Sequence, residues 1–191
     1  MLRTKYFILA FTYLIHRASA SIDTQSEAKC ISYYSTGGNY DLKELPSQMY
    51  AVYFWPPNQR QRDSCENISF KKLGQDEATQ AMQECNIINI SSNDTVMRGT
   101  YVNSAGKLKK LLYYGNEEVK SMYRACDKTI SKYIFIKVND NYVLGINCSA
   151  GGRGVLLSRF LSSESEVRAI AGSVGIMTGR EGSPDCPLRR R

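Results

Sequence analysis

The sequence predicts an all-β protein with one C-terminal helix, folded as an eight-stranded antiparallel up-and-down β-barrel. Two observations carry this prediction. Eight short segments rich in β-branched and aromatic residues follow one another at nearly regular spacing, with turn-forming residues between them. One apolar stripe with helical periodicity then follows near the C-terminus. Closing such strands into a barrel removes exposed edges and leaves an interior that holds side chains or one small ligand.

The expected strands share alternating or continuous apolar character, and they end at proline, glycine or asparagine. Pro56 and Pro57 end the first strand because proline cannot continue a ladder. Asn139-Asp140-Asn141 joins the sixth and seventh strands as a hairpin. A weaker helical stretch, 75–84, fills a long connection. The eight expected strands are 48–55, 65–70, 85–90, 95–102, 108–114, 133–138, 142–148 and 155–160.

The C-terminal helix has a clear start. Ser163 can cap it, and Glu166 completes a capping box three residues later. Its apolar stripe recurs at positions i, i+3, i+4 and i+7 and consists of Val167, Ile170, Ala171 and Val174. Such a stripe is most often a packing face, so we expect a helix near 163–172 that docks on the outside of the barrel.

The N-terminus predicts export. Basic residues, an apolar stretch over 6–15 and the small residues Ala18-Ser19-Ala20 are typical of a signal peptide spanning 1–20. A membrane anchor is the competing interpretation, but the apolar run is far shorter than the ~20 residues that cross a bilayer. We therefore expect a secreted, extracellular product without a membrane span, one domain over 21–186, and a basic tail over 187–191. The tail is interpreted as solvated disorder, with docking or trimming as alternatives.

Composition argues against several function classes. The one histidine of the chain, His16, lies in the signal, which excludes Ser-His and Cys-His catalysis and the usual zinc sites from the mature protein. No carboxylate pair stands out for acid–base chemistry. The formal charge of +7 shrinks once the signal is removed, and Arg189, Arg190 and Arg191 hold three of the remaining positive charges. We expect no enzyme, no metal, no cofactor and no nucleic-acid partner.

Cysteines and glycosylation motifs fit the extracellular setting. Six widely spaced cysteines in an exported chain predict three disulfides, and sequence alone allows 15 pairings. Four sequons occur, at Asn67, Asn89, Asn93 and Asn147. Asn147 is the weakest of the four because Cys148, the next residue, is expected to be in a disulfide.

At this point local motifs resemble the lipocalins of the calycin superfamily, most closely the disulfide-bonded secreted lipocalins of insects. Residues 40–53 resemble the entry into the family's first strand, 133–144 its sixth and seventh strands, and 156–159 the signature that ends the eighth. Where the family has Gly-x-Trp, this chain has Ser47-Gln48-Met49. The resemblance implies that Met49 and Arg159 close one end of the barrel.

The resemblance also implies a disulfide pairing. In that group an N-terminal cysteine reaches the end of the seventh strand, and a second-strand cysteine holds the C-terminal tail. Carried over, this gives the pairs Cys30–Cys148, Cys65–Cys186 and Cys85–Cys126.

A lipocalin-like barrel implies that a small hydrophobic ligand binds in a calyx that opens at one end. If Met49 points inward, the two-residue period places Ala51 and Tyr53 on the same face. Comparable candidates on other strands are Tyr101, Tyr113, Phe135 and Leu144. Each of these residues could instead serve ordinary sheet packing, and strands with two apolar faces leave the inward face undecided.

Two alternatives stay open. A filled barrel could bind another protein through the polar connections 56–64 and 89–95, as an inhibitor or interaction module. A different disulfide-rich β fold, such as a trefoil, would lack the strand order and terminal helix expected here.

Overall fold

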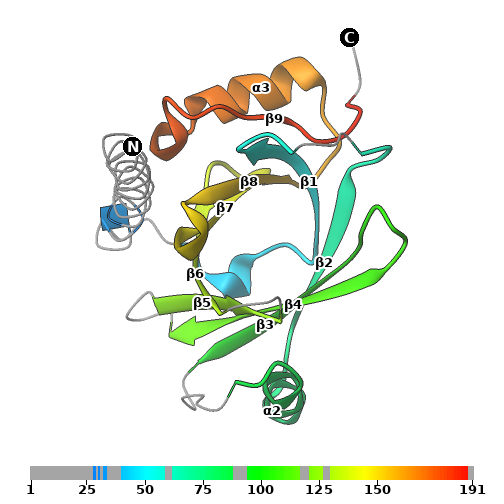
Figure 1. Ribbon diagram of the computed structural model, residues 1–191, viewed down its shortest axis with the longest axis vertical. Coiled ribbons are helices and arrows are strands. Elements are labelled where there is room, and N and C mark those ends of the chain that lie inside the picture. Colours follow the sequence, from blue (N-terminus) through cyan, green and yellow to red (C-terminus); the bar gives the residue numbers. More distant parts are fainter. Residues whose placement is uncertain are drawn as a thin grey trace, which may run out of the picture.

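Eight strands close into a barrel in the computed structural model of the chain (Figure 1). The structure describes residues 28, 30, 32–33, 40–58, 62–87, 94–116, 121–126 and 130–188. Consecutive strands pair antiparallel, and β1 pairs with both β2 and β8, which closes the ring. The strands are β1 (Gln48–Trp55), β2 (Glu66–Lys72), β3 (Thr95–Val102), β4 (Leu108–Asn116), β5 (Ser121–Ala125), β6 (Ser131–Lys137), β7 (Tyr142–Asn147) and β8 (Arg153–Ser158). The expected fold class, a closed up-and-down barrel with a C-terminal helix, is confirmed.

The number of strands agrees with the expectation, but one expected strand is wrong. Residues 85–87 end the helix α2 (Gln75–Glu84) instead of forming a strand, and 88–90 lie outside the described residues. Asn86 takes the left-handed conformation, with φ of 56°, which stops the helix. Ile87 then packs against the cluster beneath α2. The count of eight is completed by β5, a strand that was not expected from the sequence.

Two helices cover opposite sides of the barrel (Figure 1). The C-terminal helix α3 (Glu164–Ser173) begins at Ser163, whose hydroxyl accepts a hydrogen bond from the Glu166 amide at 3.3 Å. Its residues Val167 and Ala171 pack on apolar side chains of β1, β7 and β8. On the other side, α2 buries Ala78, Ala81 and Met82 against the outer face of β3, β4 and β5. The outer faces of these strands therefore carry apolar side chains where a helix covers them.

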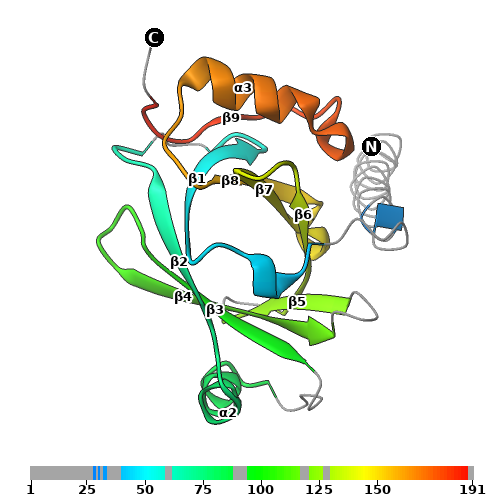
Figure 2. The ribbon, with the colours of Figure 1, turned by 180° about the vertical axis from the view of Figure 1, so that it is seen from behind.

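The end of the barrel where β1 begins is plugged by the segment that precedes it, which crosses the ring of strands in Figure 2. The short 3-10 helix η1 (Leu42–Glu44) inserts Leu42, and the next residues add Leu45 and Met49. Arg159 is exposed and lies beside Tyr40, to whose hydroxyl it hydrogen-bonds. This end of the barrel is therefore closed by apolar side chains, and we call the other end the mouth.

Three disulfides pair Cys30 with Cys148, Cys65 with Cys186, and Cys85 with Cys126. These are the pairs that the lipocalin resemblance implied. The first two bridges close chain segments of 118 and 121 residues, and the third ties the end of α2 to the end of β5. Cross-links over such long segments restrict the unfolded chain strongly.

The remaining short elements are η2 (Cys148–Ala150), η3 (Gly175–Met177) and β9 (Ser183–Pro184). The strand β9 pairs with Tyr53 and Phe54 of β1, beyond the point where β1 stops pairing with β2. The C-terminal segment thus covers the β1 edge near the mouth. Within the described residues, no helix has both the length and the apolar character needed to cross a membrane.

Candidate ligand-binding site

The interior of the barrel is lined by every second residue of its strands. The inward residues form one buried cluster, to which most of the strands contribute. From β4 to β7 the cluster includes Tyr113, Met122, Tyr133, Phe135 and Val143. On β5, Met122 and Arg124 share this inward face, while Tyr123 and Ala125 pack outward under α2.

Aromatic rings fill the middle of the barrel. Tyr113 lies 5.2 Å from Tyr133 and 5.1 Å from Phe135, measured between ring centroids. Phe70 approaches Tyr113 at 6.1 Å and Phe135 at 6.4 Å. Edge-to-face pairs at these distances add stability beyond the area they bury. The middle of the barrel is therefore built as an aromatic core, and space for a ligand lies above it.

Two inward glycines make room for these rings. A Cβ atom on Gly145 would lie 2.4 Å from the Tyr133 hydroxyl oxygen, and one on Gly99 would lie 3.1 Å from Cε2 of Tyr113. Gly145 therefore fixes where the Tyr133 ring lies, because no larger residue leaves that space empty.

Above the aromatic core, a pocket of about 680 Å³ opens at the mouth. Phe54, Trp55 and Val155 give it apolar walls, and Pro56 and Pro57 form part of its rim. Its described polar lining comes from Asn58, Arg124, Tyr133, Asn147 and Arg153. A volume of this size falls in the range of small-molecule pockets.

The Tyr113 phenol beneath the pocket has a perturbed pKa. Burial raises the pKa of the Tyr113 phenol well above its ordinary value, and the neighbouring Tyr133 adds to the rise. The charge of Arg124 and its hydrogen bond act in the opposite direction. The Tyr113 hydroxyl therefore keeps its proton at neutral pH.

The structure brings four of the six expected ligand-binding residues to the interior. Ala51, Tyr113 and Phe135 are buried there, and Tyr101 is partly buried against the same cluster. Among these, Tyr113 and Phe135 belong to the aromatic core, below the pocket.

The other two expected residues, Tyr53 and Leu144, lie on the outer face beneath α3. A β-bulge between Ala51 and Tyr53 inserts Val52, which shifts the alternation of β1 by one residue and points Tyr53 outward and Phe54 inward. Leu144 lies outward because α3 covers that face of β7, so both faces of the strand are apolar. The inward placement expected for these two residues is therefore wrong.

Sequence reasoning missed the polar side chains of the mouth. Arg124 lies on the strand that was not expected, and Asn147 was considered only as a glycosylation motif. A sequence signal existed in the period of two that places Arg124 on the same face as Met122, and Arg153 on the same face as Val155.

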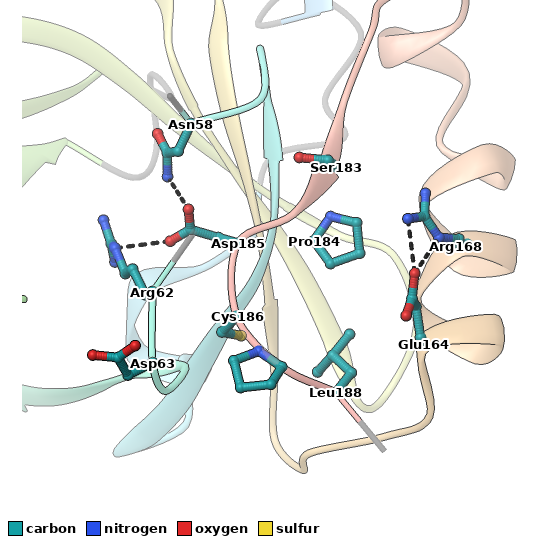
Figure 3. Close-up of a pocket in the computed structure, with 11 residues that line it drawn as sticks. Asn58, Arg62, Asp63, Glu164, Arg168, Ser183, Pro184, Asp185, Cys186 and Leu188 are labelled. Atoms are coloured by element: carbon teal, nitrogen blue, oxygen red, sulfur yellow. Dashed lines mark hydrogen bonds and ion pairs between the residues drawn. The ribbon is translucent and has the colours of Figure 1, made fainter. Parts of the chain in front are cut away.

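A second pocket, of about 660 Å³, lies outside the barrel between α3 and the C-terminal segment (Figure 3). Its buried Asp185 accepts a hydrogen bond from Asn58 at 2.6 Å and pairs with Arg62 at 2.8 Å. The adjacent Cys186 is bonded to Cys65. Because these polar groups pair with one another, we interpret this region as a clamp that holds the C-terminal segment on the barrel.

The sequons differ in their surroundings. Asn67 is exposed on β2, whereas Asn147 is only 7% exposed. Asn89 and Asn93 lie outside the described residues, as do the expected signal peptide and the three terminal arginines.

No protein-family model and no curated protein matches the chain. Among solved structures, lobster apocrustacyanin A1 is 12% identical, with a TM-score of 0.42 over 75% of this chain and 77% of that chain. Apocrustacyanin C2 is 13% identical, with a TM-score of 0.41 over 73% and 76%. H1 crustacyanin from the lobster Homarus americanus is 12% identical, with a TM-score of 0.41 over 73% and 75%. These scores are low, and the closed eight-stranded barrel with its C-terminal helix rests on the strand pairing within this chain.

Proposed function

We propose that the protein is a secreted lipocalin that carries or sequesters a small hydrophobic ligand in the mouth of its barrel. The observation that supports this most is the pocket lined by Phe54, Trp55 and Val155 above the aromatic core. The apolar walls face several polar groups of the same pocket, so it offers contacts to both the apolar and the polar part of a small molecule. We also propose that the protein is most similar to the disulfide-bonded secreted lipocalins of insects and that it has no catalytic activity.

The filled middle of the barrel limits the size and position of the ligand. Rings of Phe70, Tyr113, Tyr133 and Phe135 contact one another across the interior, and the η1 segment plugs the end below them. A long ligand would have to displace these rings. We therefore propose a compact ligand that rests on the ring of Tyr133 and touches Val155, rather than one that reaches the base of the barrel.

The proposed setting is extracellular. Three disulfides are stable in oxidising compartments, and residues 1–20 have the pattern of a signal peptide. We propose that the mature chain begins at Ser21, that residues 21–186 form the domain, and that 187–191 are a tail. The intact mass of the secreted protein tests this processing, and a mass that corresponds to a first residue other than Ser21 would contradict it.

A second candidate function is binding of another protein. The observation that favours it is the hairpin between β3 and β4, where Val102 and Leu108 face each other and are 56% and 63% exposed. Neighbouring exposed apolar side chains on a strand pair are typical of contact surfaces. A protein that co-purifies with the wild type and is lost from a Val102→Ser/Leu108→Ser variant would favour this function.

Titration with a neutral fluorescent probe, N-phenyl-1-naphthylamine, tests the small-ligand proposal. Trp55 is the one tryptophan of the chain and lines the mouth pocket, so a probe bound there accepts energy from it. We expect energy transfer that saturates at micromolar probe. Val155→Phe, which fills the mouth, should weaken binding about tenfold, an effect that corresponds to roughly 1.4 kcal/mol.

Phe160→Ala is the matched control, because Phe160 is 60% exposed near the closed end. It should bind the probe as the wild type does. The proposal fails if the wild type gives no energy transfer at micromolar probe, or if Val155→Phe, shown to be folded by circular dichroism, binds as tightly as the wild type.

A further inference from the structure

The strand register brings four polar side chains of the mouth into one row. Tyr133 of β6 is paired with Asn147 of β7, and Asn147 is paired with Arg153 of β8. Arg124 of β5 completes the row, since its guanidinium carbon lies 5.0 Å from the centroid of the Tyr133 ring. All four residues line the mouth pocket.

The charge of this row is positive. Two of the described residues that line the pocket are arginines, and none of those described is acidic. Arg124 is half-buried, and the mouth pocket that it lines has the apolar side chains of Phe54 and Val155 in its walls. A guanidinium in such surroundings favours an anion more strongly than one in open water.

The guanidinium of Arg124 rests on a fixed support. The Tyr133 ring beneath it contacts the rings of Tyr113 and Phe135. Its hydroxyl end occupies the space that Gly145 leaves open. Stacking on an aromatic face orients a guanidinium, whose five N–H groups lie around its edge. The Tyr113 hydroxyl below it accepts a hydrogen bond from Arg124, which also helps to fix the position of the guanidinium.

A second, independent observation points to a bound hydrogen-bond donor, a water or a ligand hydroxyl, at the same place. Asn147 is buried, with 7% of its surface exposed. Its Oδ1 atom has no hydrogen-bond partner in the part of the chain that the structure describes. A buried polar atom without a partner destabilises a protein, so such atoms are rare unless a bound water, ion or ligand completes them. Asn147 faces the same pocket as Arg124.

We propose that the ligand of the mouth pocket is an apolar acid, whose carboxylate binds the edge of Arg124 and whose apolar body packs on Phe54 and Val155. This inference rests on the proposed function and adds the charge of the ligand to it. Arg153, on the rim, contributes a second positive charge. Asn147 Oδ1 only accepts, so it takes a hydrogen bond from a bound water or from a hydroxyl group of the ligand rather than from the carboxylate. A neutral molecule of the same shape uses only the apolar contacts and binds more weakly.

The test compares dansylglycine, a compact apolar acid, with its methyl ester, which has the same apolar body but no charge. Both accept energy from Trp55, so one assay measures both. We expect the acid to bind the wild type at least about tenfold more tightly than the ester, because a charge-assisted hydrogen bond is lost in the ester. Added salt should weaken binding of the acid and leave that of the ester nearly unchanged.

Variants then assign the charge effect to one residue. Arg124→Gln should lose about tenfold in acid affinity and little in ester affinity. Arg168→Gln, on α3 where Arg168 pairs with Glu164 at 2.8 Å, removes the same charge from a residue that does not line the mouth pocket and should change neither. Circular dichroism and Trp55 emission confirm that each variant is folded.

The outcomes separate this inference from the proposed function. If acid and ester bind the wild type equally, the charge inference is wrong while the small-ligand function stands. If neither binds, the proposed function fails as well. If Arg124→Gln does not fold, Arg153→Gln and the salt dependence of the wild type still decide, and an acid preference that neither salt nor Arg153→Gln reduces overturns the inference.

Discussion

Gly145→Ala tests whether the aromatic core is packed as described. The added Cβ would lie 2.4 Å from the hydroxyl oxygen of Tyr133 and 3.1 Å from its Cε1 and Cζ atoms. The ring cannot retreat freely, because Tyr113 and Phe135 contact it at 5.2 and 5.1 Å. Overpacking of this kind typically costs ~1–3 kcal/mol. Alanine restricts the unfolded chain more than glycine, which offsets ~0.5 kcal/mol, so we expect a net loss of about 1–2 kcal/mol.

Urea unfolding followed by Trp55 emission, with all disulfides intact, measures this loss. Gly99→Ala should lose less stability, because the added Cβ would lie 3.1 Å from its nearest neighbour, Cε2 of Tyr113. Gly172→Ala is the opposite control: nothing lies within 4 Å of the added atom in α3, so it should gain ~0.5–1 kcal/mol. Tyr133→Phe removes the closest contact, and a double-mutant cycle with Gly145→Ala should give a coupling of roughly 1 kcal/mol. A Gly145→Ala protein as stable as the wild type would refute the packing described here.

Four further predictions concern stability and modification. Replacing both cysteines of the Cys85–Cys126 bridge by alanine should lower the free energy of unfolding by up to about 4 kcal/mol, and urea unfolding that shows no change would contradict a structural role for the bridge. Ser163→Ala should cost ~1 kcal/mol by removing the cap of α3, and the same assay measures it. Burial raises the pKa of Asp185 in the folded protein, although a hydrogen bond from Asn58 and the charge of Arg62 oppose the rise, so the folded state holds this proton more tightly than the unfolded state. This contribution to stability is complete below the ordinary carboxyl pKa and is lost as pH rises through the raised one. The stability of the wild type minus that of Asp185→Asn should therefore fall as pH rises from below the ordinary carboxyl pKa through the raised pKa, and a difference that grows with pH would contradict the raised pKa. Peptide mass spectrometry after enzymatic deglycosylation should find a glycan at exposed Asn67 and none at buried Asn147, and the reverse pattern would contradict the described burial.

Local sequence patterns predicted most of the barrel. The bounds of β1 and β3 agree with the expected ranges, because each segment is rich in β-forming residues and is followed by a turn residue such as Pro56. The bounds of α2 agree as well, although its helical signal was weaker. The segment 85–90 misled the prediction because Cys85 and Ile87 are apolar for a different reason: they pack beneath α2 at the end of the helix. β5 escaped notice because it has five residues and includes a serine and an arginine.

The inward and outward faces were harder to predict than the strands. One inserted residue, Val52, reverses the alternation of β1, and nothing in the local sequence marks that bulge. In β7, all six residues are buried, because α3 covers one face and the interior covers the other. The direction of Tyr53 and Leu144 therefore depends on tertiary packing. The same holds for the row of Arg124, Asn147 and Arg153, which only the register of four strands brings together.

A crystal structure of the protein with sodium 1-naphthylacetate, a compact apolar acid, tests the mouth site most directly. We expect the carboxylate within hydrogen-bond distance of the Arg124 guanidinium and the naphthyl ring against Phe54 and Val155. Naphthylacetate that binds only outside the barrel, or a mouth that stays empty at saturating concentration, would contradict the site proposed here.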